Sequence, residues 1–127
     1  MKIAITVWGN RISPVFDAAS TLLLVEVDGN SVVGRDIKVC QPSRHDSFIT
    51  LLKDNEVRLL VCGAICEAAV KRVEASGVEV APFLAGEVER LLESYVDERD
   101  FTEFAMPGCR HGRCCRGRYK RIEESQG

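Results

Sequence analysis

The sequence predicts a small three-layer α/β domain followed by a flexible, basic, cysteine-rich tail. Short apolar runs bounded by glycine and proline predict strands, and later in the chain they alternate with apolar residues at helical spacing. At 127 residues the chain has the length of one domain that can bury a core without disulfides. Its content of 46% hydrophobic and 28% charged residues is typical of a globular protein. We expect a domain at residues 1–105 and a tail at residues 106–127.

Three strands are predicted in the first third of the chain. Lys2–Trp8 is a nearly continuous apolar run, which is typical of a strand buried on both faces. The loop Gly9–Pro14 follows it. Thr21–Val27 and Ser31–Val39 are strands joined by the tight turn Asp28–Asn30, so we expect them to form an antiparallel hairpin.

Helices and strands alternate after the hairpin. Gly77 is expected at the C-terminal cap of the second helix, because glycine adopts the left-handed conformation that ends many helices. The third helix has the clearest amphipathic pattern in the chain. The expected elements are a helix at Asp46–Asp54, a strand at Val57–Cys62, a helix around Ile65–Val73, a strand at Val78–Pro82 and a helix at Leu84–Val96.

The resulting element order, βββαβαβα, predicts a five-stranded mixed sheet with an antiparallel hairpin on one side and parallel strands on the other. This is the ribonuclease H-like or nucleotide-fold arrangement of a small three-layer domain. In open α/β sheets, ligands bind outside the carboxyl ends of the parallel strands, near the point where the strand order reverses. The loops expected at that edge are Gly9–Asp17, Gly63–Cys66 and Phe83–Glu87.

Small and polar residues gather in these three loops and predict a ligand site. Glycine and alanine allow a ligand to approach the backbone, and an arginine offers a fixed positive fork. The alternative is that the glycines serve turns and the arginine is a solvated surface charge. The candidate cofactor-binding residues of the domain are Asn10, Arg11, Ser13, Gly63, Ala64 and Gly86.

Two cysteines lie beside the same edge. Cys62 ends a predicted strand and Cys66 falls in the first turn of the next helix, where the helix N-terminus favours a thiolate. Three residues separate them, whereas a thioredoxin-type pair has two. We therefore interpret Cys62 as a small core residue and keep Cys66 as a candidate metal ligand.

The segment Met106–Arg116 is the most unusual part of the chain, because it holds three thiols and an imidazole between arginines and glycines. Arginine beside cysteine favours the thiolate, the form that binds metal. Adjacent cysteines do not readily ligate one structural zinc ion, whereas softer metal–sulfur species accept looser arrangements. The alternative is a disordered basic tail. The candidate metal ligands here are Cys109, His111, Cys114 and Cys115, and Arg110 and Arg113 are candidate cofactor-binding residues.

Charge divides unevenly along the chain. Residues 1–108 carry 11 basic and 17 acidic side chains, a net charge of −6, whereas residues 109–127 carry six basic and two acidic, a net charge of +4. The tail should therefore seek an anion. An arginine-rich nucleic-acid arm is disfavoured because the body is acidic, and two-metal nuclease chemistry lacks the inward carboxylates it needs. With no predicted signal peptide or membrane span, we expect a cytoplasmic protein with reduced thiols.

Several segments together resemble the dinitrogenase iron–molybdenum cofactor biosynthesis family. The similarity spans roughly residues 1–109, and its most specific blocks are Ser13-Pro14-Val15-Phe16-Asp17 and Cys62-Gly63-Ala64-Ile65. The other matching segments are Met1–Ile5, Arg11–Ala19, Leu24–Val27, Gly77–Phe83 and Met106–Cys109.

The resemblance implies a ribonuclease H-like domain that carries or delivers a metal–sulfur cluster. Members of the family bind an iron–sulfur cofactor precursor or a molybdenum–copper sulfide cluster without acting as enzymes. This sequence departs from the family pattern at Cys66, where serine is common, and in its tail, which packs three cysteines and a histidine. Both departures make direct ligation of the cluster by thiolates more plausible here.

Three hypotheses follow from the sequence. The first is a non-enzymatic carrier or scaffold for an anionic metal–sulfur cluster (iron–sulfur, iron–molybdenum precursor or molybdenum–copper type), working with other cluster-assembly or acceptor proteins. The second is a zinc-stabilised regulatory or nucleic-acid-binding module that acts through residues 109–121. The third is a thiol redox enzyme that uses Cys62 and Cys66. The sequence favours the first and leaves the metal, the delivery partner and the oligomeric state open.

Overall fold

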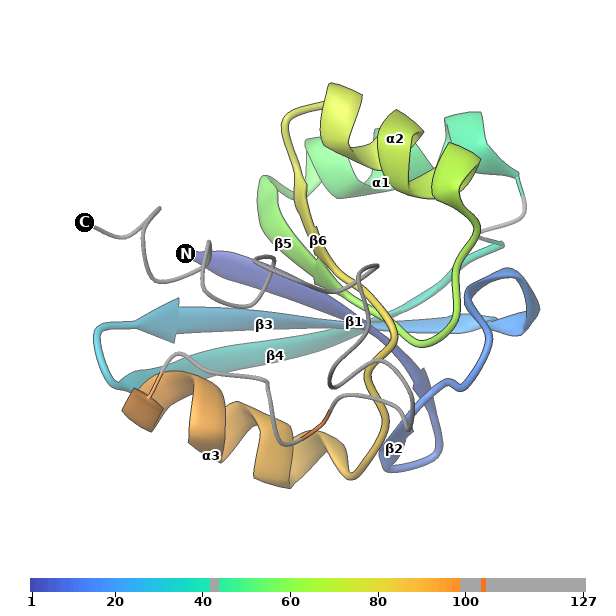
Figure 1. Ribbon diagram of the computed structural model, residues 1–127. Coiled ribbons are helices and arrows are strands. Elements are labelled where there is room, and N and C mark those ends of the chain that lie inside the picture. The colour runs from blue at the N-terminus through green and yellow to red at the C-terminus, as the bar shows by residue number, and fades with distance from the viewer. Residues whose placement is uncertain (42–43, 99–103, 105–127) are drawn as a thin grey trace.

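In the computed structural model, which describes residues 1–41, 44–98 and 104, one mixed sheet lies between two helical layers (Figure 1). The strand order is β4-β3-β1-β5-β6, and a short strand β2 also pairs with β1. Helices α1 and α2 cover one face of the sheet and α3 covers the other. The predicted three-layer α/β architecture with a mixed sheet is therefore confirmed.

The strands have these bounds: β1 Lys2–Trp8, β2 Arg11–Ile12, β3 Thr21–Asp28, β4 Ser31–Val39, β5 Val57–Val61 and β6 Glu79–Ala81. Strand β3 is antiparallel to β1 and β4, whereas β5 is parallel to both β1 and β6. The hairpin predicted at Asp28–Asn30 is present, and Gly29 takes the positive φ of 60° that its turn requires. Strands β1, β4, β5 and β6 consequently all end at the same edge of the sheet.

The helices have these bounds: α1 His45–Asp54, α2 Glu67–Ala75 and α3 Val88–Glu98, with a single 3₁₀ turn, η1, at Phe16–Ala18. Gly77 ends α2 as predicted, with a φ of 97° and its N–H donated to the Glu74 carbonyl. None of the helices in the described ranges is both long and apolar enough to span a membrane.

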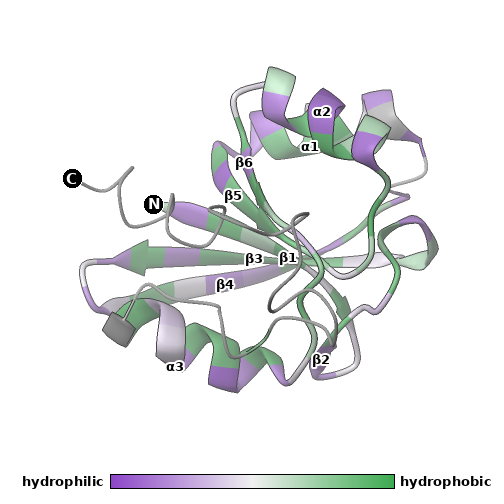
Figure 2. Cartoon of the chain, viewed as in Figure 1, coloured by the Kyte–Doolittle hydropathy of each residue, from purple (hydrophilic) through white to green (hydrophobic). Residues whose placement is uncertain are grey.

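Each face of the sheet has its own core, which explains the continuous apolar run of β1. Ile3, Ile5 and Val7 pack toward α3, while Ala4 packs toward α1 and α2. Figure 2 shows hydrophobic residues along the central strands and hydrophilic residues on the outer sides of the helices. A central strand covered on both sides cannot alternate apolar and polar residues, because neither of its faces meets water.

Two details of the expected element order are wrong. The segment 9–20 is not a plain loop: Arg11 and Ile12 pair with Trp8 and Val7 to form β2, and η1 follows. The third helix begins at Val88 instead of Leu84, because Gly86 has a φ of 131° and interrupts the helical conformation. Leu84 is fully buried, so it continues the apolar stripe from a loop.

Candidate functional site at the carboxyl edge of the sheet

The loops that follow β1, β5 and β6 meet at one edge of the sheet, and we call residues 9–17, 62–66 and 82–87 the rim. Hydrogen bonds between backbone groups join the three segments. The Ala64 N–H donates to the Pro14 carbonyl at 2.8 Å, and the Phe16 N–H donates to the Ala64 carbonyl at 2.8 Å. The Phe83 N–H donates to the Gly63 carbonyl at 2.9 Å. The rim is therefore one connected structure, built where sequence reasoning expected the site.

Gly63 allows two of these loops to touch. A Cβ at Gly63 would lie 2.3 Å from the Ser13 carbonyl oxygen and 2.5 Å from that of Pro14. Real Cβ atoms do not approach backbone oxygens so closely, so only glycine fits while the loops keep these positions. The space at Gly63 is filled by the chain itself, and the adjoining Ala64 forms a short parallel bridge with Val15.

The other candidate residues of the first loop have distinct environments. Asn10 is exposed, and its carbonyl accepts the Val88 N–H at 2.9 Å, which fixes the start of α3. Arg11 is exposed, and its backbone bridges to Glu87. Ser13 is buried, and its hydroxyl donates to the Val15 carbonyl at 3.2 Å. Arg11 is thus the one candidate of this loop whose charged side chain faces solvent.

Gly86 adjoins an aromatic residue that the sequence pattern does not indicate. The Phe104 ring is buried, and it would lie 3.1 Å from a Cβ placed on Gly86. The Phe104 carbonyl accepts the Ala85 N–H at 2.8 Å. The chain beyond α3 therefore returns to the rim at Phe104, five residues before Cys109.

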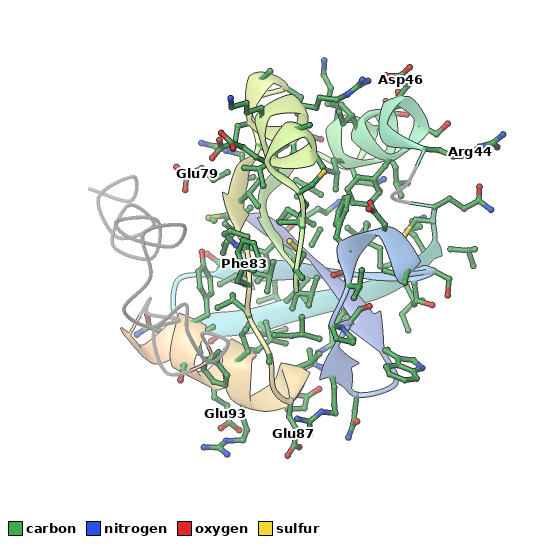
Figure 3. All side chains as sticks on the ribbon, turned by 45° about the vertical axis from the view of Figure 1, so that its right-hand side comes forward. Arg44, Asp46, Glu79, Phe83, Glu87 and Glu93 are labelled. Carbon is green, nitrogen blue, oxygen red and sulfur yellow. The ribbon has the colours of Figure 1, made fainter. Side chains whose placement is uncertain are left out.

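Phe83 is a second residue that sequence reasoning missed. It takes a φ of 59°, in the left-handed region that a bulky side chain rarely adopts, and its ring packs against both cores. Figure 3 shows it between the α2 layer and the α3 layer, on the side of β6. Such backbone strain is concentrated at functional sites, and here it lies directly beside Gly63. Only the positive φ marks this residue, and no sequence signal predicts it.

The thiols of the domain differ in access. Cys62 is completely buried, and burial raises the pKa of its thiol, so it does not react as a thiolate. Burial also raises the pKa of the Cys40 thiol, to about 11. Cys66 is exposed at the N-cap position of α2. The interpretation of Cys62 as a core residue agrees with this burial, which disfavours a Cys62–Cys66 redox pair.

Charge at the described part of the rim is not positive. Arg11 shares it with Asp17 and Glu87, and Glu67 begins α2 beside Cys66. Figure 3 shows the Glu87 side chain pointing away from the sheet. Within residues 1–41, 44–98 and 104, no three His, Cys, Asp or Glu side chains are grouped to hold a metal ion.

The tail candidates lie outside the described residues. They are Cys109, Arg110, His111, Arg113, Cys114 and Cys115, and the expectation that this tail is flexible lies outside them as well. What the structure fixes is the nearest described point, Phe104 at the rim.

A pocket of about 250 Å³ opens beside the first rim loop. Trp8 and Val15 line it and are 75% and 45% exposed, and Ser13 and Ala19 contribute to its walls. Trp8 is thus a large apolar side chain that remains exposed at the edge of a cavity. The rim therefore combines one cation, one accessible thiol and an apolar hollow.

Comparison with known proteins identifies the family. The family model described as dinitrogenase iron-molybdenum cofactor matches residues 1–98. The chain belongs to this family. Among curated proteins, none matches the chain.

Several solved structures share the fold of this chain. PH0822 has a TM-score of 0.69 at 16% identity, covering 76% of this chain and 88% of its own. MJ0327 from Methanocaldococcus jannaschii, whose name assigns it to the dinitrogenases, has a TM-score of 0.62 at 24% identity, with coverage of 76% and 88%. The apo form of the orange protein from Desulfovibrio gigas has a TM-score of 0.58 at 17% identity, with coverage of 76% and 87%.

Proposed function

We propose that this protein is a non-enzymatic carrier or scaffold for an anionic metal–sulfur cluster, used in cofactor assembly, delivery or storage. The observation that carries the proposal is the family match over residues 1–98, which contains the whole rim. The cluster is of the iron–sulfur, iron–molybdenum precursor or molybdenum–copper sulfide type. It is the cargo of the protein, and the rim is where the domain receives it.

The ligands in this proposal are thiolates and one imidazole. Cys66 is the accessible thiol of the rim, and the tail adds Cys109, His111, Cys114 and Cys115. Soft thiolate ligands select soft metal–sulfur species over hard cations. Two sources of ligand, a fixed rim and a tethered tail, suit a carrier that must both hold and release its cargo.

Charge balance assigns a role to the arginines of the tail. An anionic cluster next to Asp17, Glu67 and Glu87 is repelled unless cations outnumber these carboxylates locally. Arg11 alone does not outnumber them. Arg110 and Arg113, which alternate with the tail thiols, supply the missing positive charge at the cluster.

The support for a carrier rather than an enzyme comes from the chemistry of the described rim. Catalytic acids and bases are usually titratable groups whose pKa is shifted in a cleft. Among the side chains whose burial is described, the buried polar groups are the hydroxyls of Thr6, Ser13 and Tyr95 and the thiols of Cys40 and Cys62, and none is a carboxyl, imidazole or amine. The buried thiol of Cys62 has a raised pKa and no access to solvent.

We also propose a ribonuclease H-like topology, a cytoplasmic location and acceptor proteins as partners.

The test is oxygen-free purification of the full chain, reconstitution with iron, sulfide and molybdate, and then absorption spectroscopy with elemental analysis. We expect a coloured protein that retains metal and sulfide after desalting. The variant Cys109→Ser/Cys114→Ser/Cys115→Ser should lose most of this metal, while Cys66→Ser reports the contribution of the rim. A protein that stays colourless under all these conditions contradicts the proposal.

The same experiment distinguishes the carrier proposal from the alternative function. A zinc-stabilised nucleic-acid-binding module predicts one zinc per chain, no sulfide, and binding to DNA or RNA that weakens steeply with salt. That set of results would replace the carrier proposal.

A further inference from the structure

Phe104 is the last residue whose position the structure describes, and it lies far from its sequence neighbours in α3. Helix α3 starts at the rim with Val88 and runs for 11 residues, so its last turn lies about 16 Å from the rim. Phe104 nevertheless contacts Ala85 and Gly86, at the rim end of the helix. By residue 104 the chain is therefore at the rim end of α3 again, before the cysteine segment begins.

Two contacts hold Phe104 at the rim. Its carbonyl accepts the Ala85 N–H at 2.8 Å, and its ring, 7% exposed, joins the core on the α3 side of the sheet. Gly86 lies directly below the ring, at a φ of 131° that favours glycine. A Cβ at position 86 would lie 3.1 Å from the ring, so the ring would have to shift by a few tenths of an ångström. The loop 84–86 is thus shaped to receive this one aromatic residue.

We infer that Phe104 is a positioning residue that anchors the cysteine-rich tail at the rim. The inference rests on the proposed function for its purpose, because the tail thiols are the proposed ligands of the cargo. The predicted effect of Phe104 on the tail thiols does not require any cargo. Anchoring at Phe104 shortens the tether of each tail thiol and moves its origin from the far end of α3 to the rim.

Chain geometry shows that the anchored tail reaches the rim thiol. A path from Phe104 to Cys66 passes through the hydrogen bonds of Ala85 and Phe83 and along five residues, which bounds the separation at about 25 Å. Ten residues separate Phe104 from Cys114, and they extend to about 33 Å. Without the anchor, the tether would start at Glu98 and contain 16 residues. Effective concentration falls as a tether lengthens. The longer tether therefore gives an effective concentration of Cys114 at Cys66 that is roughly two- to fivefold lower than the anchored tether gives.

The test measures this effective concentration as a disulfide equilibrium. Cys109→Ser and Cys115→Ser leave Cys114 as the single tail thiol, while Cys40 and Cys62 stay buried. The full chain is equilibrated with reduced and oxidised glutathione, so that one oxidised glutathione becomes two reduced molecules for each Cys66–Cys114 disulfide formed. Mass spectrometry of the quenched chain gives the equilibrium constant, which is the effective concentration of the two thiols.

We expect Phe104→Ala to lower this constant roughly two- to fivefold and Phe104→Leu, which keeps an apolar side chain, to retain most of it. Gly86→Ala loosens the same contact from the other side and should also lower it. Leu52→Ala is the control, because Leu52 is fully buried on the α1 and α2 face and does not touch the anchor.

A constant unchanged in Phe104→Ala overturns the inference, as does an equal decrease in Leu52→Ala. Because the assay contains no metal, its failure is separate from failure of the carrier proposal. If the chain binds no cluster but Phe104→Ala still lowers the equilibrium constant, the anchor inference stands and the carrier proposal is wrong.

Discussion

At the level of one residue, sequence reasoning at Gly63 predicted a close approach to the backbone but not the group that approaches it. A glycine after a buried strand indicates that something approaches the backbone closely. In the structure that neighbour is the Ser13-Pro14 backbone. Gly86 is a second example, because the group close to its backbone is the Phe104 ring. A glycine in the sequence indicates that a neighbouring group approaches the backbone closely. Which group this is depends on contacts between segments that are distant in the sequence.

The contact at Gly63 predicts a large loss of stability in Gly63→Ala. The new methyl group would meet two carbonyl groups of the backbone, which cannot rotate away as a side chain would. We expect the free energy of unfolding, measured by urea denaturation, to fall by about 3 kcal/mol or more.

Gly34→Ala is the matched control for that variant. Gly34 lies in β4, and the nearest atom to its added Cβ is 3.7 Å away, an ordinary contact. We expect its stability to change by less than about 0.5 kcal/mol. Equal effects of the two substitutions would show that the rim loops are not packed as described.

At the level of elements, the sequence predicts best what periodicity controls. The hairpin of β3 and β4 and the central strand β1 were predicted to within a residue, because long apolar patterns and a glycine turn define them. Strand β2 has two residues, which is too few to show a period. The start of α3 was wrong because Leu84 is buried for a reason other than helix formation. Phe104 lies where periodicity has faded, so the sequence offers no sign of its anchor.

One ion pair joins strand β4 of the sheet to helix α3, and it predicts a pH dependence. The Arg35 guanidinium in β4 donates two hydrogen bonds to the Glu89 carboxylate in α3, with Nη2 2.9 Å from Oε1. This hydrogen bond is the main reason that the pKa of Glu89 is lowered. Glu89 therefore binds its proton less readily in the folded than in the unfolded chain, so the pair stabilises the fold above the unfolded pKa.

The measurement is a double-mutant cycle with Arg35→Ala and Glu89→Ala, by urea denaturation. Both side chains are well exposed, at 41% and 61%, so solvent screening limits the coupling energy at pH 7 to about 0.2–1 kcal/mol. The coupling should disappear as the pH falls through the folded pKa of Glu89. A coupling that grows on acidification would contradict the assignment.

At the level of the whole molecule, the sequence places an acidic region before a basic segment rich in thiols. The family model covers residues 1–98 of the acidic region, and the anchor proposed at Phe104 would connect that region to the basic segment. The carboxyl edge could be chosen as the proposed site from the sequence, because strand order alone suggests that edge. Whether the tail thiols meet the rim depends on contacts beyond the described residues, which no local pattern specifies.

The most direct test of the central claim, that rim and tail hold the cargo together, compares the full chain with a synthetic peptide of residues 106–127. Both are reconstituted without oxygen with iron, sulfide and molybdate, desalted, and analysed for metal per mole. The account predicts that the full chain retains the cluster and that the peptide retains little of it, because the peptide lacks the rim. Equal metal retention by the peptide and the full chain would contradict the account.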